Sequence, residues 1–316
     1  MLLKIHLFLL SFILACTQLS SSTYITPYAL YYGDDYNLTC YTVPYPFGIA
    51  DVALQGFEIG CSDMKPWIDA PLLSLSNYTY TIQEISILQG YIKIFAGPIH
   101  KRCLGAGGLW TESEGSGWFN LDGTPFTLSY QYNMLTVVGC NNLVLIRSGD
   151  TNLTSGCVTF CDPQVSKGGS CSGLGCCQAA LPGPLKSFHL EFTQVSILNS
   201  SVHDMFNCSA AFFGQRDDFQ SNQSGFLFQK VDIHDTDFYD NSLIRLDWVV
   251  STESCEDARN NISSFACKNN SYCYNSPSMN GYLCNCSEGY EGNPYAKDGC
   301  TGIIHNFQAS ENYQCF

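Results

Sequence analysis

The sequence predicts a mostly β, disulfide-rich multi-module extracellular protein, and three observations favour this fold class. Eighteen cysteines in 316 residues are typical of secreted scaffolds, because oxidising compartments preserve disulfides. Several segments alternate apolar and polar residues with a period of two, which predicts half-buried strands. No segment carries a helical stripe longer than one or two turns.

The N-terminus predicts a signal peptide over residues 1–22. Lys4 precedes a short apolar stretch that ends at Ala15, and small and polar residues follow. A membrane anchor is the alternative, but His6 and Ser11 interrupt the stretch, which is too short for a bilayer. The rest of the chain has no apolar run of about 18 residues and no lipid-anchor signal. We therefore expect a secreted protein without a membrane-spanning segment in this chain.

The first expected domain, 24–161, contains strand patterns. Apolar and polar side chains alternate over 126–133, which predicts a strand. The stretch 80–95 is rich in Ile, Tyr and Thr and is broken by a Gln-Gly pair, which predicts a hairpin. The Gly-rich stretch 104–123 is expected to be a long loop.

The second expected domain, 162–252, contains strand patterns at 188–192 and 244–250. The segment 255–300 has the spacing C-x11-C-x5-C-x10-C-x-C-x13-C, which is that of an EGF-like module, and a tail, 301–316, follows it. Such a module is too small for a hydrophobic core and depends on cross-links. Spacing alone leaves fifteen connectivities open for six cysteines.

Charge and glycosylation motifs restrict the partners. The net charge of −14 argues against nucleic acid, because phosphate binding needs clustered Lys and Arg. Nine N-x-S/T motifs predict a glycosylated surface, at Asn37, Asn77, Asn152, Asn199, Asn207, Asn222, Asn261, Asn269 and Asn285.

Several motifs together resemble the extracellular region of plant wall-associated receptor kinases. These motifs are Val43–Ile49 (VPYPFGI), Val137–Cys140, Gly156–Cys161, Gly169–Gln178, Cys208–Phe212, Leu246–Trp248 and Gly289–Tyr295. The resemblance implies a galacturonan-binding domain over 24–161, a wall-associated kinase C-terminal-like region over 162–252 and the EGF-like module. Relatives of full length lie at the plasma membrane. We expect a soluble ectodomain-like form or the product of a truncated gene, because this chain ends without a membrane helix or a kinase.

The resemblance also implies disulfide pairs. In the EGF-like module these are Cys255–Cys273, Cys267–Cys284 and Cys286–Cys300. Family members usually carry further cysteines around the Tyr-Pro-Phe motif, whereas only Cys40 and Cys61 flank it here, so we expect these two to pair. The adjacent Cys176 and Cys177 are expected to bond to different partners, because a bond between neighbours is strained.

Pectin, a polymer of galacturonate, is the ligand that the resemblance implies. An acidic protein repels a polyanion, but salt screens distant charges over about 8–10 Å, so a local basic patch can decide binding. The candidate contacts are Lys93, His100, Lys101 and Arg102 for carboxylates and Trp67, Trp110 and Trp118 for sugar faces. The alternative is that the cations are solvated and the tryptophans are packing residues.

Metal and catalytic roles are weaker interpretations. Zinc could be held by the cysteines between 157 and 177, and calcium by Asp232, Asp235, Asp237 and Asp240. Carboxylate pairs such as Asp217 with Asp218 could serve glycoside cleavage. Surface acids and disulfides explain these residues more simply, and no nucleophile, phosphate-loop or kinase motif occurs. We expect no cofactor, no metal and no enzyme activity.

The sequence therefore predicts non-catalytic binding of cell-wall polysaccharide by a secreted receptor-like ectodomain. The alternative is a protein-interaction or decoy module that engages a receptor, a related ectodomain or a peptide. The two hypotheses differ in their response to salt and to methyl-esterification of pectin.

Overall fold

The computed structural model describes ten stretches of the chain: residues 38–63, 69–75, 78–96, 100–104, 110–112, 118–148, 154–161, 171–195, 208–215 and 243–303. All of them belong to one compact unit, residues 38–316. The signal peptide expected at 1–22 lies outside the described residues. In the described part of the chain, no helix is long and apolar enough to cross a membrane.

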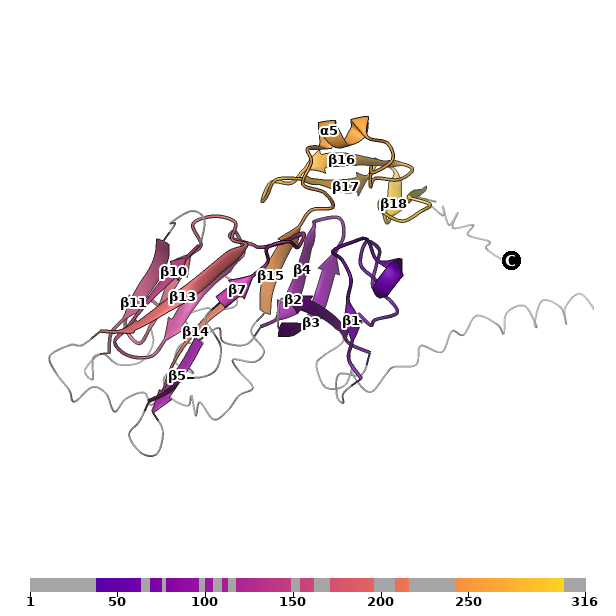
Figure 1. Cartoon of the computed structure of the whole chain (residues 1–316). Coiled ribbons are helices and arrows are strands. Elements are labelled where there is room, and N and C mark those ends of the chain that lie inside the picture. The colour runs from indigo at the N-terminus through magenta and orange to yellow at the C-terminus, as the bar shows by residue number, and fades with distance from the viewer. Residues whose placement is uncertain are drawn as a thin grey trace, which may run out of the picture. The chain divides into compact units, whose positions relative to one another are not determined.

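The largest sheet has six strands, all paired in antiparallel fashion. In spatial order they are β1 (Gly60–Cys61), β2 (Pro71–Leu75), β3 (Tyr78–Ser86), β4 (Tyr91–Phe95), β15 (Leu243–Trp248) and β8 (Phe126–Leu128). Strand β15 comes late in the chain, yet it lies beside β4 (Figure 1) and pairs with β8 on its other side. The expected segments 24–161 and 162–252 therefore contribute strands to one sheet, and their boundaries stay a prediction.

Two further sheets pack against each other. The four-stranded sheet has the order β11 (Thr154–Thr159), β10 (Asn142–Arg147), β13 (Ser187–Gln194) and β7 (Trp118–Asn120). The five-stranded sheet has the order β12 (Cys176–Ala180), β9 (Asn133–Val138), β14 (Cys208–Gln215), β5 (His100–Leu104) and β6 (Trp110–Glu112). Their inner faces meet at Phe188 of β13 and Phe213 of β14, whose ring centroids are 5.1 Å apart.

The C-terminal module contains α5 (Cys255–Asn260) and two small hairpins. One pairs β16 (Ser271–Asn275) with β17 (Tyr282–Cys286), and the other pairs β18 (Tyr290–Gly292) with β19 (Cys300–Gly302). Helix α5 begins after Ser254, whose hydroxyl accepts a hydrogen bond from Asp257 N at 3.1 Å and so caps the first turn. A single 3-10 turn, η1 (Ala50–Val52), lies in the Tyr-Pro-Phe segment.

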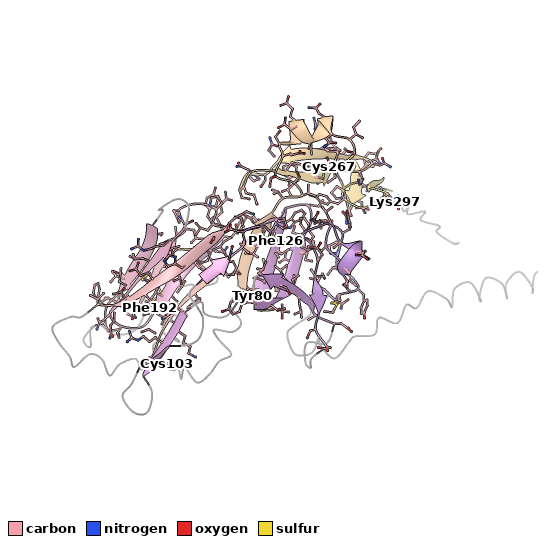
Figure 2. The ribbon with its side chains drawn as sticks, in the orientation of Figure 1. Tyr80, Cys103, Phe126, Phe192, Cys267 and Lys297 are labelled. Carbon is pink, nitrogen blue, oxygen red and sulfur yellow. A yellow bond between two sulfur atoms is a disulfide. The ribbon has the colours of Figure 1, made fainter. Side chains whose placement is uncertain are left out.

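An aromatic cluster forms the core beneath the six-stranded sheet. Trp248 is fully buried, and its ring lies 5.7 Å from Phe47 and 5.2 Å from Phe57. Phe126 of β8, labelled in Figure 2, lies 5.8 Å from Phe57. Tyr295 of the C-terminal module lies 5.7 Å from Trp248, and its hydroxyl accepts a hydrogen bond from Cys284 N at 2.8 Å. Edge-to-face contacts of this kind add to the burial energy of the rings.

Seven disulfides have both ends among the described residues. They are Cys40–Cys61, Cys140–Cys161, Cys157–Cys177, Cys171–Cys176, Cys255–Cys273, Cys267–Cys284 and Cys286–Cys300. Three of these, in the C-terminal module, are the pairs that the family resemblance implies, and Cys40–Cys61 is the pair expected around the Tyr-Pro-Phe motif. Cys103 is also disulfide-bonded, and Cys208 lies opposite it in the register of β5 and β14. The expectation that Cys176 and Cys177 have different partners is confirmed.

The mostly β fold class is confirmed, as are a hairpin within 80–95 and a strand at 188–192. The strand expected over 244–250 is confirmed as far as Trp248, where β15 ends. The expectation of a loop over 104–123 is wrong for the described residues of this stretch. They contain β6 and β7, which pair with β5 and β13 respectively. The expected strand over 126–133 ends at Leu128. A turn follows, because Asn133 N donates a hydrogen bond back to Ser129 O at 3.0 Å.

Candidate functional site

Polar side chains form two rows on the face of the six-stranded sheet that is opposite the aromatic core. Glu84, Lys93 and Arg245 are neighbours across β3, β4 and β15 in one row. Tyr91 and Asp247 are neighbours in the next row. Residues paired in register point to the same face of a sheet, so these five side chains share one surface. We call this surface, together with Tyr132, the tyrosine–arginine platform.

Arg245 lies at the centre of the platform, between two tyrosine rings. Its guanidinium carbon is 3.9 Å from the centroid of Tyr91 and 3.5 Å from that of Tyr132. Its Nε donates a hydrogen bond to Asp247 Oδ1 at 3.0 Å. Arg245 is only 9% exposed, and a buried guanidinium requires such an anionic partner. The planar guanidinium stacks on both rings and so fixes their orientation.

Asn133 attaches the turn that carries Tyr132 to the strand that carries Arg245. This fully buried amide donates to Ser129 O and to Arg245 O, both at 2.7 Å. It also accepts a hydrogen bond from Arg245 N at 3.0 Å. Ser129 N donates to Arg245 O at 3.1 Å as well. The position of Tyr132 above Arg245 is therefore set by the backbone and does not depend on the stacking alone.

Glu84 and Lys93 are the charged residues of the platform that are more exposed than Arg245 and Asp247. Lys93 Nζ lies 2.8 Å from Glu84 Oε2, and the Tyr91 hydroxyl donates to the same carboxylate. Burial alone would raise the pKa of Glu84, but the hydrogen bonds from Lys93 and Tyr91 outweigh it and hold that pKa below its ordinary value. Burial and the bond to Glu84 raise the pKa of Tyr91 to about 12. At neutral pH the net charge of the platform is zero, because it contains two acids, Glu84 and Asp247, and two bases, Lys93 and Arg245.

The structure separates the cations that the sequence grouped into one basic patch. Lys93 belongs to the six-stranded sheet, whereas His100, Lys101 and Arg102 belong to β5 of the five-stranded sheet. Alternation along β5 puts His100 and Arg102 on one face and Lys101 on the other. The ring of His100 stacks on Phe192 at 4.6 Å, on the side that meets the four-stranded sheet. All three side chains are half-buried.

The tryptophans expected to stack on sugars cannot be placed in a site. Trp67 lies outside the described residues. Trp110 begins β6 and Trp118 begins β7, in two different sheets, and their side chains lie outside the described part. The acidic residues Asp217, Asp218, Asp232, Asp235, Asp237 and Asp240 also lie outside it.

Disulfides occupy the cysteines that were considered as zinc ligands. Each of the five between positions 157 and 177 is bonded to another cysteine, so none offers a thiolate. Of the nine glycosylation motifs, three lie in the described stretches: Asn261 and Asn269 are exposed and Asn285 is half-buried in β17. The Oδ1 atom of Asn285 accepts a hydrogen bond from Cys286 N at 2.8 Å.

Sequence reasoning missed Tyr132, Tyr91, Arg245, Asn133 and Asp247 as site residues. Tyr132 and Arg245 did belong to two segments recognised as alternating strands. The signal that was available is an Arg-x-Asp pair, Arg245 and Asp247, on the polar side of a strand otherwise composed of large apolar residues.

Comparison with known proteins identifies relatives of the chain. Over 96% of its length it is 29% identical to wall-associated receptor kinase 1 and 31% identical to wall-associated receptor kinase 5, both of Arabidopsis thaliana. Over 59% of its length it is 34% identical to wall-associated receptor kinase 2 of the same plant. The chain spans about 40% of the length of the first two relatives. No family model matches the chain. No solved structure matches it either.

Proposed function

Because this chain is homologous to the extracellular region of wall-associated receptor kinases, we propose that it is an extracellular, non-catalytic module that binds the acidic polysaccharide of the plant cell wall, pectin. The observation that carries the proposal is the match over 96% of the chain to receptors whose name places them at the wall. The match covers the portion of these receptors that precedes the kinase. Its disulfides and glycosylation motifs also suit an oxidising, extracellular location.

Half-buried cations of β5 would supply the contacts to galacturonate. Lys101 is half-buried on the outer face of β5, and Arg102, which is also half-buried, lies on the opposite face and precedes the disulfide-bonded Cys103. A strand fixed by a disulfide holds such cations at low conformational cost. The polyanion would then meet local positive charge even though the protein is acidic overall, since salt screens the distant acids.

The ionised acids of the platform support a binding role over a catalytic one. Glycoside cleavage needs one carboxyl group that stays protonated near neutral pH. Glu84 is instead held ionised by Lys93 and Tyr91. Asp247 accepts from the Arg245 guanidinium and is buried, so neither acid is placed to donate a proton to a sugar.

Retention on immobilised polygalacturonate, compared with the fully methyl-esterified polymer, tests the proposal. We expect retention on the acidic polymer that weakens as salt is raised, and loss of retention in the Lys101→Ala, Arg102→Ala double variant. A control with the same change of charge is Lys268→Ala, Lys297→Ala, since both lysines are exposed in the C-terminal module. Equal loss in the control would mean a non-specific charge effect, and no retention of the natural chain would overturn the proposal.

A protein-interaction role is the second candidate, and one observation favours it. The C-terminal module exposes four large apolar side chains: Ile262 (87%), Tyr272 (45%), Tyr290 (39%) and Ile303 (41%). Large apolar side chains exposed on a small domain are available for contact with a protein partner. This role predicts that the chain captures a related receptor ectodomain. The capture should be lost in the Ile262→Ser, Tyr290→Ser double variant and should not depend on pectin esterification.

A further inference from the structure

We propose that the tyrosine–arginine platform binds an uncharged pyranose ring, which stacks on the open face of Tyr132. This inference rests on the proposed binding of wall polysaccharide, but it assigns a second subsite with a different chemistry. The basic residues of β5 would contact free carboxylates. The platform would contact sugar residues whose carboxyl groups are esterified or absent.

The geometry of Tyr132 leaves one ring face available. The Arg245 guanidinium covers the other face at 3.5 Å from the ring centroid. Tyr132 is nevertheless 43% exposed, and Arg245 covers one of the two faces of its ring. An exposed aromatic ring backed by a buried side chain offers a flat apolar surface, which matches the C–H face of a pyranose.

The platform is also rigid before any ligand arrives. Asn133 holds the turn of Tyr132 to Arg245 through hydrogen bonds of 2.7 and 3.0 Å, and Asp247 fixes the guanidinium. Tyr91 lies against the second face of the same guanidinium at 3.9 Å. A ring held in this way loses little conformational freedom when a sugar stacks on it, and this lowers the cost of binding.

Charge balance selects an uncharged ring over a galacturonate. The platform carries Arg245 and Lys93 as cations and Asp247 and Glu84 as anions, so its charges cancel. Both cations are already bonded to these carboxylates and have no uncompensated charge for a further anion. Glu84, whose side chain is 40% exposed, can accept hydrogen bonds from hydroxyl groups, and Lys93, at 23%, can donate to them.

The competing interpretation is that the stack only stabilises the fold. A purely structural stack would account for the buried Arg245, Asp247 and Asn133. It does not require the exposed area of Tyr132 and of Glu84, which a sugar can contact. The two interpretations differ in whether Tyr132 affects binding of sugars at a salt concentration that screens charges.

Binding of two uncharged probes tests the inference: a fully methyl-esterified oligogalacturonide and a galactan oligosaccharide. Calorimetry at ~1 M NaCl, where the screening length is about 3 Å, removes the contribution of the basic residues. We expect Tyr132→Ala to weaken binding of the accepted probe at least about fivefold, the size of one aromatic contact. Tyr132→Phe should bind like the natural chain, because the ring is retained.

The matched control is Tyr78→Ala, since Tyr78 is 46% exposed on the same sheet but lies outside the platform. Binding of neither probe, or equal binding by the natural chain and Tyr132→Ala, overturns the inference. Binding of de-esterified oligogalacturonide at low salt is measured in parallel, so failure of the proposed function is seen separately. If only the galactan binds, the sugar that stacks on Tyr132 is a neutral one. If only the methyl-esterified oligogalacturonide binds, that sugar is an esterified galacturonate.

A second measurement does not depend on a folded variant. Nitration of Tyr132 in the natural chain is followed by peptide mass spectrometry with and without each probe at ~1 M NaCl. Protection of Tyr132 by a probe, with Tyr78 still modified, supports the inference. Equal nitration of Tyr132 with and without both probes overturns it.

Discussion

Replacing Asn133 with alanine is expected to destabilise the protein by about 3–5 kcal/mol. The side chain makes three hydrogen bonds, two as donor at 2.7 Å and one as acceptor at 3.0 Å. At a net value of about 1 kcal/mol each, their loss costs about 3 kcal/mol. Arg245 N–H also loses its acceptor in a buried environment, which adds about 1–2 kcal/mol. The carbonyl groups of Ser129 and Arg245 each keep another donor.

Guanidinium unfolding with the disulfides intact measures this change. Tryptophan fluorescence is a suitable probe, because the fully buried Trp248 lies in β15 three residues from Arg245. Hydrogen exchange of the Arg245 amide reports the same site locally and should accelerate. Asn260→Ala is the control: its exposed amide donates one bond at the end of α5, at 3.2 Å, and its loss should cost less than about 0.5 kcal/mol.

The Asn133→Asp variant separates hydrogen bonding from packing. A carboxylate keeps the acceptor for Arg245 N–H but loses both donors and faces two carbonyl oxygens. Burial and these oxygens raise the pKa of the new carboxyl group, so stability is present at low pH and is lost as the pH rises. A loss below about 1 kcal/mol in Asn133→Ala, or unchanged protection of the Arg245 amide, would refute the reasoning.

Three further predictions concern the core, the disulfides and the platform. Tyr295→Phe removes the acceptor of buried Cys284 N–H and should cost about 1–2 kcal/mol in the same unfolding assay; an unchanged midpoint would contradict this. Replacing the bonded pair Cys157 and Cys177 with serines opens a loop of 20 residues, so it should lower the free energy of unfolding by about 3 kcal/mol or prevent secretion. A variant as stable as the natural chain would exclude a stabilising role for this disulfide. Folding raises the pKa of Tyr91 from 10.0 to about 12, so its contribution to stability is present below pH ~10 and is lost as the pH rises through 12. The phenolate absorbance of the natural chain minus that of Tyr91→Phe measures this titration, and a midpoint near the ordinary value would refute the assignment.

Local sequence patterns were sufficient for several strands, such as β3, β4 and β13, and for the C-terminal module. The break at Gly90 predicted a hairpin, and β3 and β4 form it, with Gly90 at a positive φ of 67° in the turn. The alternation over 188–192 predicted β13. Both signals depend on residues close together in the chain, where a period of two or a turn residue directly limits the backbone.

The sequence failed where burial depends on distant segments. Arg245 and Asp247 occupy the polar positions of an alternating strand, which predicts exposure, yet they are 9% and 4% exposed. Tyr132 covers Arg245 from a turn that is far away in the chain. Alternation along β5 directs Lys101 away from His100 and Arg102, although the three are consecutive, because this segment forms a strand that pairs with the distant β14.

The sequence by itself determined the oxidised, mostly β character of the protein and its family, because cysteine spacing and alternation are properties of short segments. Only the tertiary structure decided which polar residues form a surface. Asn133 and Arg245 are 112 residues apart, and their hydrogen bonds exist only when β15 inserts between β4 and β8. That insertion is driven by burial of Trp248 among the rings of Phe47, Phe57 and Tyr295, and burial depends on what surrounds a side chain in space.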